Sequence, residues 1–190
     1  MEALTDMEAI ERIYNTRLRE DFARNERKPL SAIRRALERD EYRCWGLFRE
    51  DALLGYAFFV RYPDGDGTIY LFDYLAIDRS LRDTGLGTAF LSRLAECFTA
   101  SDLVIGEVDD PDRADGEERV LRERRLRFYY GNGCVDTGVR SVVFGADYRI
   151  LEMPTGPRRS REEIRAAYDR VYRHIFPSVI YRRCFSLRDP

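Results

Sequence analysis

Two glycines and an arginine lie where the chain is expected to turn from a strand into a helix. Residues 70–77 form an apolar run typical of a buried strand, and residues 85–98 have the apolar spacing of a helix. The start of a helix presents unpartnered backbone N–H groups and the positive end of the helix dipole, which together can bind an anion. Glycine lets a phosphate approach the backbone closely. We therefore predict a phosphate site formed by one segment, Arg82, Asp83, Thr84, Gly85, Leu86, Gly87 and Thr88.

The spacing of this phosphate segment, R-x-x-G-x-G, differs from two common phosphate-binding motifs. A P-loop would need a lysine after its last glycine, but Thr88 follows Gly87. A dinucleotide-binding fingerprint would need a third small residue where the chain has Phe90. The alternative interpretation is a tight turn before a helix, because glycine commonly marks turns.

The composition indicates one folded domain without a strong net charge. The chain has 190 residues, and 13% of them are aromatic, which argues against disorder. A formal net charge of -2 gives no overall attraction to nucleic acid or to an anionic membrane. The 4 cysteines form no C-x-x-C pair and His174 is the single histidine, so we expect reduced thiols, no metal site and a cytoplasmic protein. We also expect neither a targeting leader nor a membrane-spanning segment.

Apolar periodicity and turn residues predict helices and strands around the phosphate segment. Capping-box patterns at Thr5 with Glu8, and at Ser160 with Glu163, favour two helix starts. The strand–helix–strand succession over residues 70–108 predicts parallel pairing of its two strands. The expected elements are helices at 5–22, from 31, and at 85–98, 117–130 and 160–175, with strands at 42–48, 53–62, 70–77, 103–108, 139–144 and 148–153.

The phosphate segment resembles motif A of the GNAT family, the Gcn5-related N-acetyltransferases. The pattern of that motif is Q/R-x-x-G-x-G/A, and Arg82, Gly85 and Gly87 match it. The strand before the segment, which ends at residue 77, is similar to the fourth strand of the family. The motif is thus preceded by the expected element.

A second segment, residues 124–134, resembles motif B of the same family, in which a helix ends in F-Y-x-x-x-G-F. Phe128, Tyr129 and Gly133 match this pattern, while Cys134 stands where an aromatic residue is usual. Two motifs in the expected order and spacing are more specific than either one alone. The resemblance covers roughly residues 42–150.

The resemblance implies an α/β fold of the GNAT-like acyl-CoA N-acyltransferase type, a mixed twisted β-sheet flanked by helices. It implies acetyl-CoA as donor and a primary amine of a small molecule or peptide as acceptor. Tyr129 matches the family's tyrosine that donates a proton to the leaving thiolate; its alternative role is a core-facing aromatic that pairs with Phe128. The pyrophosphate would lie on the phosphate segment, and the pantetheine arm would pair with the strand edge Leu75, Ala76 and Ile77.

Such a reaction needs a group that takes a proton from the acceptor, because a lysine-like amine with a pKa of about 10.4 is protonated at neutral pH. Glu107 lies at the C-terminal end of the strand 103–108, on the face opposite Val108. Asp73 lies inside the run 70–77, where a buried carboxylate is costly unless it is paired or used. We expect Glu107, or else Asp73, to be the base. A relaying water, or a purely structural ion pair of either carboxylate with an arginine, is the alternative.

The connection at residues 109–118 is strongly acidic and directly follows the strand of Glu107. The family often has an asparagine after its fifth strand that contacts the cofactor, and this chain has Asp109, Asp110 and Pro111 there instead. If the carboxylates face the acceptor side, they would attract a cationic acceptor such as a polyamine, an aminoglycoside-like compound or a protein amine. A solvated loop is the alternative.

Two other functions fit parts of the sequence. A GNAT-like fold could hold acyl-CoA as a non-catalytic sensor or interaction module. The arginines of residues 121–127 are dense enough to bind nucleic-acid phosphates. However, they spread around the helix and the net charge is negative, so we expect no nucleic-acid partner.

The chain is expected to divide into a GNAT domain at residues 1–155 and a C-terminal helical extension at residues 156–190. The tail after Pro177 is too apolar for a terminus that makes no packing contacts, since it contains Val179, Ile180 and Phe185. It would dock either on the domain or on a second subunit of a homodimer.

Overall fold

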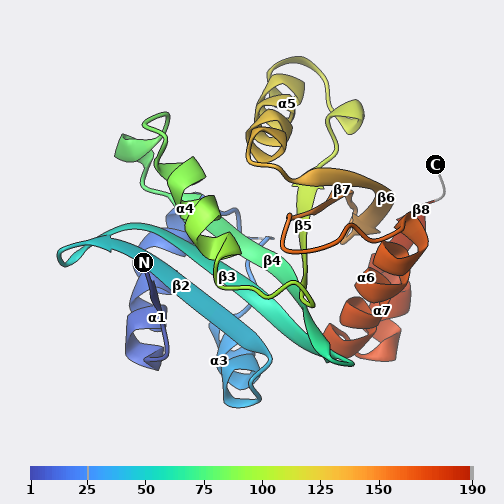
Figure 1. Cartoon of the computed structure of the whole chain (residues 1–190), viewed down its shortest axis with the longest axis horizontal. Helices are drawn as coiled ribbons and strands as arrows, with labels where there is room; N and C mark the ends of the chain where they lie inside the picture. Colours follow the sequence, from blue (N-terminus) through green and yellow to red (C-terminus); the bar gives the residue numbers. More distant parts are fainter. Residues whose placement is uncertain (25, 189–190) are drawn as a thin grey trace. The chain divides into compact units, whose positions relative to one another are not determined.

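The computed structural model describes residues 1–24 and 26–188, and the chain divides into two compact units. The first unit comprises residues 1–61 and 72–93. The second comprises residues 62–71 and the described residues from 94 onward. Two strands and one helix contribute residues to both units: β3 (Ala52–Asp64), β4 (Gly67–Ile77) and α4 (Leu86–Ala95) (Figure 1).

The N-terminal helical region of the first unit is interrupted, although the sequence predicted one helix over residues 5–22. Asp6, rather than the expected Thr5, caps the first helix and accepts hydrogen bonds from the backbone N–H groups of Glu8 at 3.2 Å and Ala9 at 3.1 Å. A π-helical segment follows, in which the Thr16 hydroxyl donates to the Arg12 carbonyl at 2.7 Å. Such a side-chain bond competes with regular helix geometry. The elements are α1 (Met7–Ile13), the π-helical segment Tyr14–Leu18, α2 (Arg19–Asp21) and α3 (Leu30–Glu38).

The strands of the first unit follow in the order β1 (Glu2–Ala3), β2 (Tyr42–Arg49), β3 and β4. β1 pairs antiparallel with β2, and β2 pairs antiparallel with β3 through a tight turn in which Glu50 has a φ of 52°. Gly55 of β3 is tightly placed, because a Cβ there would lie 2.9 Å from the Ala76 carbonyl oxygen of β4. The central strands are thus in close backbone contact at the end of β4.

Two successive residues of β3 build two aromatic clusters in the first unit, because neighbouring side chains of a strand point to opposite faces. Phe58 packs edge-on against Tyr42 and Tyr74, with ring centroids 6.1 and 6.3 Å apart. Its neighbour Phe59 packs against Trp45 at 5.2 Å and Phe72 at 4.2 Å. Phe58 and Phe59 are both fully buried, so this part of β3 lies at the centre of the hydrophobic core of the first unit.

The strands of the second unit follow in the order β4, β5, β7, β6, β8. β4 and β5 pair in parallel, which confirms the prediction, and their register runs from Ile69 with Leu103 to Leu71 with Ile105. The other pairs are antiparallel. The strands are β5 (Leu103–Asp109), β6 (Val135–Val143), β7 (Ala146–Glu152) and β8 (Phe185–Arg188).

Three helices belong to the second unit: α5 (Gly116–Gly131), α6 (Arg161–Ile175) and α7 (Ser178–Cys184). The predicted capping box of α6 is present, with Ser160 and Glu163 exchanging hydrogen bonds. α6 lies beside α7 and packs against β6 and β8 (Figure 1). Its buried face is a stripe at helical spacing: Ile164, Ala167, Tyr168, Val171 and Tyr172.

The described part of the C-terminal tail docks within the second unit. β8 pairs with β6 from Arg188 opposite Arg140 to Phe185 opposite Val143. Phe185 is 7% exposed. Contact with a second subunit, the other placement considered for this tail, stays a prediction. Among the described residues, no helix has the length and apolar character that crossing a bilayer requires.

Candidate functional site

The phosphate segment is an exposed turn that leads into α4. Gly85 has a φ of 83°, a conformation that favours glycine, and a Cβ placed there would meet no heavy atom within 4 Å. The first i to i−4 bond of the helix runs from the Ala89 N–H to the Gly85 carbonyl at 3.1 Å. The backbone N–H groups of the first helical turn, before Ala89, therefore have no i−4 partner within α4. An open backbone surface with these donors fits a phosphate group.

Ion pairs hold the phosphate segment to the helical region before it. Arg82 and Arg79 approach one oxygen of the Asp21 carboxylate at 3.6 and 3.7 Å, and Asp21 also accepts a hydrogen bond from the Tyr56 hydroxyl at 3.1 Å. The Asp21 side chain is only 4% exposed, whereas that of Arg82 is 52% exposed. The Arg82 charge is therefore tethered near the turn while it stays accessible to solvent.

A second anchor fixes the start of the turn. Asp78 accepts hydrogen bonds from the Ser80 backbone and hydroxyl and pairs with Arg17 at 2.7 Å. These hydrogen bonds and the Arg17 charge lower the pKa of Asp78 to about 2. The carboxylate is thus ionised at neutral pH, and the turn is held in one place.

The strand edge expected to pair with a pantetheine arm lies at the end of β4. Leu75, Ala76 and Ile77 are half-buried, and they lie beyond Leu71, the last residue of the register with β5. The next residue, Asp78, donates its backbone N–H to the Leu54 carbonyl at 2.8 Å. The end of β4 is therefore fixed by β3 within the first unit.

Asp73 has an ammonium and a phenol as partners. The Lys28 Nζ and the Tyr42 hydroxyl both donate to its carboxylate. The backbone of Lys28 is held as well, because its N–H donates to the Tyr74 hydroxyl at 2.7 Å and its carbonyl accepts from the Tyr14 hydroxyl at 2.8 Å. Asp73 therefore fastens the segment between α2 and α3 to β4. No sequence pattern pointed to Lys28, since the two residues are 45 positions apart.

We expect Lys28→Met to lower the free energy of unfolding by about 1–3 kcal/mol. The reason is that the Asp73 side chain, which is only 10% exposed, would lose its ammonium partner. Urea denaturation with an unchanged m-value would measure this loss. The matched control is Arg12→Met, which removes a pair with Glu8 whose side chains are 72% and 84% exposed. It should change stability by less than about 0.5 kcal/mol. Equal effects of the two substitutions would contradict a structural role for the Lys28 pair.

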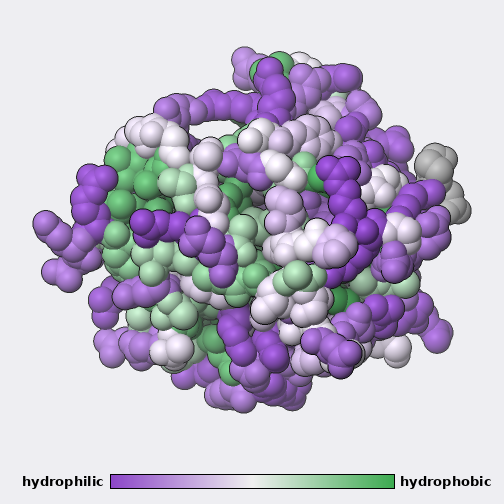
Figure 2. Space-filling view, in the orientation of Figure 1, coloured by the Kyte–Doolittle hydropathy of each residue, from purple (hydrophilic) through white to green (hydrophobic). Residues whose placement is uncertain are grey.

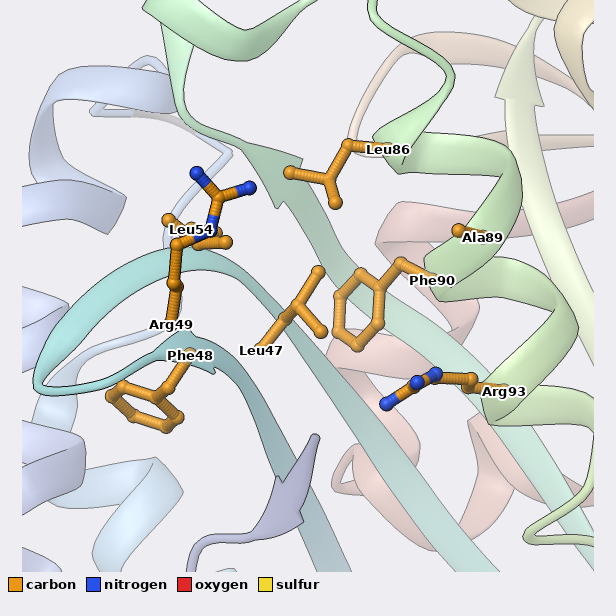
Figure 3. Close-up of a pocket in the computed structure, with 8 residues that line it drawn as sticks. All are labelled: Leu47, Phe48, Arg49, Leu54, Leu86, Ala89, Phe90 and Arg93. Atoms are coloured by element: carbon orange, nitrogen blue, oxygen red, sulfur yellow. The ribbon is translucent and has the colours of Figure 1, made fainter.

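An apolar cavity of about 250 Å³ adjoins the start of α4 within the first unit (Figure 3). The lining residues of this cavity come from β2, β3 and α4. Figure 2 shows apolar surface, coloured green, on the left of the view. The lining has two cations and no carboxylate or tyrosine, so it offers no group for proton transfer at neutral pH. The lining residues are Leu47, Phe48, Arg49, Leu54, Leu86, Ala89, Phe90 and Arg93.

Glu107, which belongs to the second unit, is half-buried on β5. The hydroxyls of Tyr168 and Tyr172 both donate to its Oε1 atom. Burial raises the pKa of both phenols well above the usual value, and the Glu107 charge raises it further. They therefore stay neutral donors at physiological pH. The sequence indicated these tyrosines only as core residues of an amphipathic helix.

Tyr129 lies near the C-terminal end of α5 in the second unit and is half-buried. Its ring packs against Phe128 with a centroid distance of 5.2 Å. Burial, with a smaller contribution from Cys134, raises the pKa of Tyr129 to about 12. The phenol therefore carries its proton at neutral pH, as a proton donor must.

The acidic connection is largely paired with arginines inside the second unit. Asp109 pairs with Arg125, and Asp110 accepts a hydrogen bond from Arg149 at 2.8 Å. Burial alone would raise the pKa of Asp110, but hydrogen bonds from Arg149 and a backbone N–H outweigh it and the net shift is downward. Asp112 also pairs with Arg149, at 2.5 Å. Arginines thus neutralise these three carboxylates, which argues against the predicted attraction of a cationic acceptor and also differs from the alternative, a solvated loop.

The predicted site residues thus fall into two groups. The phosphate segment, the end of β4 and Asp73 belong to the first unit, while Glu107 and Tyr129 belong to the second. Within the residues that the structure describes, no cluster of three or more His, Cys, Asp or Glu side chains is arranged to hold a metal ion.

A family model and a solved structure of similar fold both point to the acetyltransferase (GNAT) family. The model of the acetyltransferase (GNAT) family matches residues 8–114. A solved structure from Bacteroides thetaiotaomicron, described as an acetyltransferase of the GNAT family, is 18% identical with a TM-score of 0.65, covering 90% of this chain and 96% of that one. No match was found among curated proteins.

Two further solved structures contain acetyl-CoA. The yncA protein of Salmonella typhimurium, with its cofactor acetyl-CoA, is 17% identical with a TM-score of 0.52, covering 84% of this chain and 96% of that one. NAA60 of Arabidopsis thaliana, in complex with acetyl-CoA, is 13% identical with a TM-score of 0.53, covering 78% of this chain and 92% of that one. At these identities the likeness shows the fold, a mixed β-sheet flanked by helices.

Proposed function

The chain belongs to the acetyltransferase (GNAT) family, and from that membership we propose that it transfers an acetyl group from acetyl-CoA to a primary amine by direct attack. The observation that carries this proposal is the open turn at Gly85, which leads into α4 with Arg82 tethered beside it. Acetyl-CoA would supply the acetyl thioester and a thiolate leaving group. The backbone N–H groups of residues 83–88 and the Arg82 guanidinium would bind its phosphates.

The end of β4 would hold the pantetheine amides. Leu75, Ala76 and Ile77 lie beyond the register with β5, so their backbone groups on that side are candidates for pairing with an amide-bearing chain. The bound thioester would then be fixed relative to the sheet. Orientation of this kind accounts for a large part of the rate gain in acyl transfer.

Proton transfers accompany the exchange of the C–S bond for a C–N bond. A carboxylate takes the first proton of the acceptor ammonium, and we assign this role to Glu107, with Asp73 as the second candidate. The free amine then attacks the thioester carbon, Tyr129 gives its proton to the sulfur as the C–S bond breaks, and the second proton that the nitrogen loses restores the Tyr129 phenol. The raised pKa of Tyr129 keeps its phenol protonated, and the raised pKa values of Tyr168 and Tyr172 keep the hydroxyls around Glu107 neutral, which supports both assignments.

The acceptor is an amine on a small molecule or a peptide. Because arginines pair with the carboxylates of residues 109–112, we do not assign the acidic connection a role in acceptor binding. A homodimer and a cytoplasmic location stay predictions from the sequence. A panel of spermidine, kanamycin and a short lysine peptide, with detection of free thiol, would identify the acceptor class. Binding of acetyl-CoA without thiol release from any of these amines would favour the non-catalytic sensor.

Acetyl-CoA at about a hundredfold excess over its dissociation constant should stabilise the protein by about 2.7 kcal/mol. For a chain of this size that corresponds to a rise in melting temperature of roughly 5–10 °C. Differential scanning fluorimetry with acetyl-CoA, CoA, NAD and ATP would measure it. A shift with the two CoA species alone supports the proposal, and no shift with either contradicts it.

A pair of glycine substitutions makes this test specific to the phosphate segment. Gly85 and Gly65 both have positive φ, 83° and 63°, and at both positions an added Cβ would meet open space. Gly85→Val and Gly65→Val should therefore lower the melting temperature of the unliganded protein to a similar extent, because each puts a branched residue at positive φ. Only Gly85→Val should also lose the shift with acetyl-CoA.

A further inference from the structure

Glu107 is held by a helix that lies outside the part of the chain matched by the family model, which ends at residue 114. Tyr168 and Tyr172 are one helical turn apart on α6, and both hydroxyls donate to the same carboxylate oxygen, Oε1. A carboxylate has about four acceptor sites, so these two bonds occupy half of that capacity on one oxygen. The contact fixes where the carboxylate lies and which way it is turned.

The two phenols are themselves rigidly placed. Tyr168 is fully buried, and its hydroxyl is also within hydrogen-bond distance, 3.0 Å, of the Ser141 Oγ on β6. The Tyr172 ring stacks on Phe185 of β8 with a centroid distance of 4.3 Å and an angle of 14°, and Tyr168 packs against the same ring at 5.4 Å. β6, α6 and β8 thus jointly set the position of the two donors.

The cluster contains one carboxylate and three hydroxyl groups. Ser141 and the two phenols are neutral, and the Glu107 carboxylate accepts the hydrogen bonds of both phenols. The neighbouring carboxylates already have cationic partners: Asp109 on β5 pairs with Arg125 of α5, and Glu152 on β7 pairs with Arg159 at 3.1 Å. Asp73, which belongs to the first unit, has the Lys28 ammonium as its cationic partner.

We propose that Tyr168 and Tyr172 are positioning residues for Glu107 in the acetyl transfer, so that α6 belongs to the reaction machinery. Two neutral hydroxyl donors on one oxygen stabilise the ionised carboxylate and fix its orientation. This inference rests on the proposed function and on Glu107 as the proton acceptor.

The test uses Tyr168→Phe and Tyr172→Phe, which remove one hydroxyl each and keep the aromatic packing. Loss of a donor favours the protonated carboxyl, so the acid limb of the kcat profile should move to higher pH by about 0.5–1 unit for each variant. Below that limb kcat should fall about three- to tenfold, while the plateau at high pH is retained. The profile would be measured by thiol release at saturating acetyl-CoA, with spermidine or the better amine of the panel above.

The matched control is Tyr181→Phe on α7, whose hydroxyl also donates to a carboxylate, that of Asp169. Its profile should coincide with that of the unmodified protein. Circular dichroism and melting temperatures of the three variants would show that each is folded. A merely structural role of Tyr168 and Tyr172 would lower the melting temperature without moving the limb, and would overturn the inference.

Glu107→Gln separates failure of this inference from failure of the proposed function. If the unmodified protein releases no thiol with any amine of the panel, the proposed function fails, and the inference fails with it. If the protein is active and Glu107→Gln is equally active, the acetyl transfer stands and only the inference is overturned. Loss of activity in Glu107→Gln together with shifted limbs in both tyrosine variants supports it.

Discussion

Tyr129→Phe is expected to lower kcat about a hundredfold and to leave the KM for acetyl-CoA nearly unchanged. General acid catalysis by a placed side chain is typically worth 10²–10⁴-fold, and we expect the lower end because a thiol with a pKa of about 8.5 is already a fair leaving group. The pKa of about 12 for Tyr129 means that the phenol is protonated over the whole physiological range. Steady-state kinetics with free-thiol detection would measure both constants.

The neighbouring phenol is the matched control for this substitution. Tyr130 is 40% exposed, and its hydroxyl donates to Asp136 at 3.3 Å. Tyr130→Phe should change kcat by less than about twofold, since surface groups away from a site have small effects. If Tyr129→Phe were as active as Tyr130→Phe, Tyr129 would be an aromatic packing partner of Phe128 and nothing more.

Glu107→Gln is expected to lower kcat/KM by about 10²–10³-fold at neutral pH, through loss of the group that takes the acceptor proton. The amide oxygen can still accept the Tyr168 and Tyr172 hydrogen bonds, so the fold should persist. The residual rate should rise about tenfold per pH unit below the acceptor pKa of about 10.4, because only the free amine then reacts. A pH–rate profile of the variant would measure both effects.

Asp73→Asn tests the other candidate for the same role. If Glu107 is the base, this variant should lose stability, as Lys28→Met does, and keep most of its kcat. A large loss of kcat in Asp73→Asn with little change in Glu107→Gln would reverse the assignment. Wild-type rates in both variants would leave a water as the proton acceptor.

The main elements of the fold follow from local patterns in the sequence. The helix over residues 160–175 was predictable because Ser160 and Glu163 mark its start and apolar residues recur at helical spacing. The parallel pairing of β4 and β5 followed from the helix that connects them. The π-helical segment and β8 were not predicted, since the first depends on small energy differences within one helix and the second on pairing with a distant strand.

The site was predictable only in part, for the same reason. The turn at Gly85 is local, and a glycine spacing at a strand–helix junction reveals it. The partners of the two carboxylates are not local: Lys28 is 45 residues from Asp73, and Tyr172 is 65 residues from Glu107. A single sequence contains no pattern that links such positions. The two carboxylates could therefore be predicted as site residues, but their hydrogen-bond and ion-pair partners could not.

The separation between Glu107 and its two tyrosines also has a consequence for the order of folding. Contacts over 61 and 65 residues must first close long loops, whereas the hairpin of β2 and β3 and the turns of α6 need only near neighbours. A partly folded chain would therefore have its helices and hairpins before the carboxylate acquires its hydroxyl donors. In such a chain, helices and hairpins would already give a far-ultraviolet dichroism signal while the carboxylate still faced water. That signal alone would therefore not show that the catalytic group is in place.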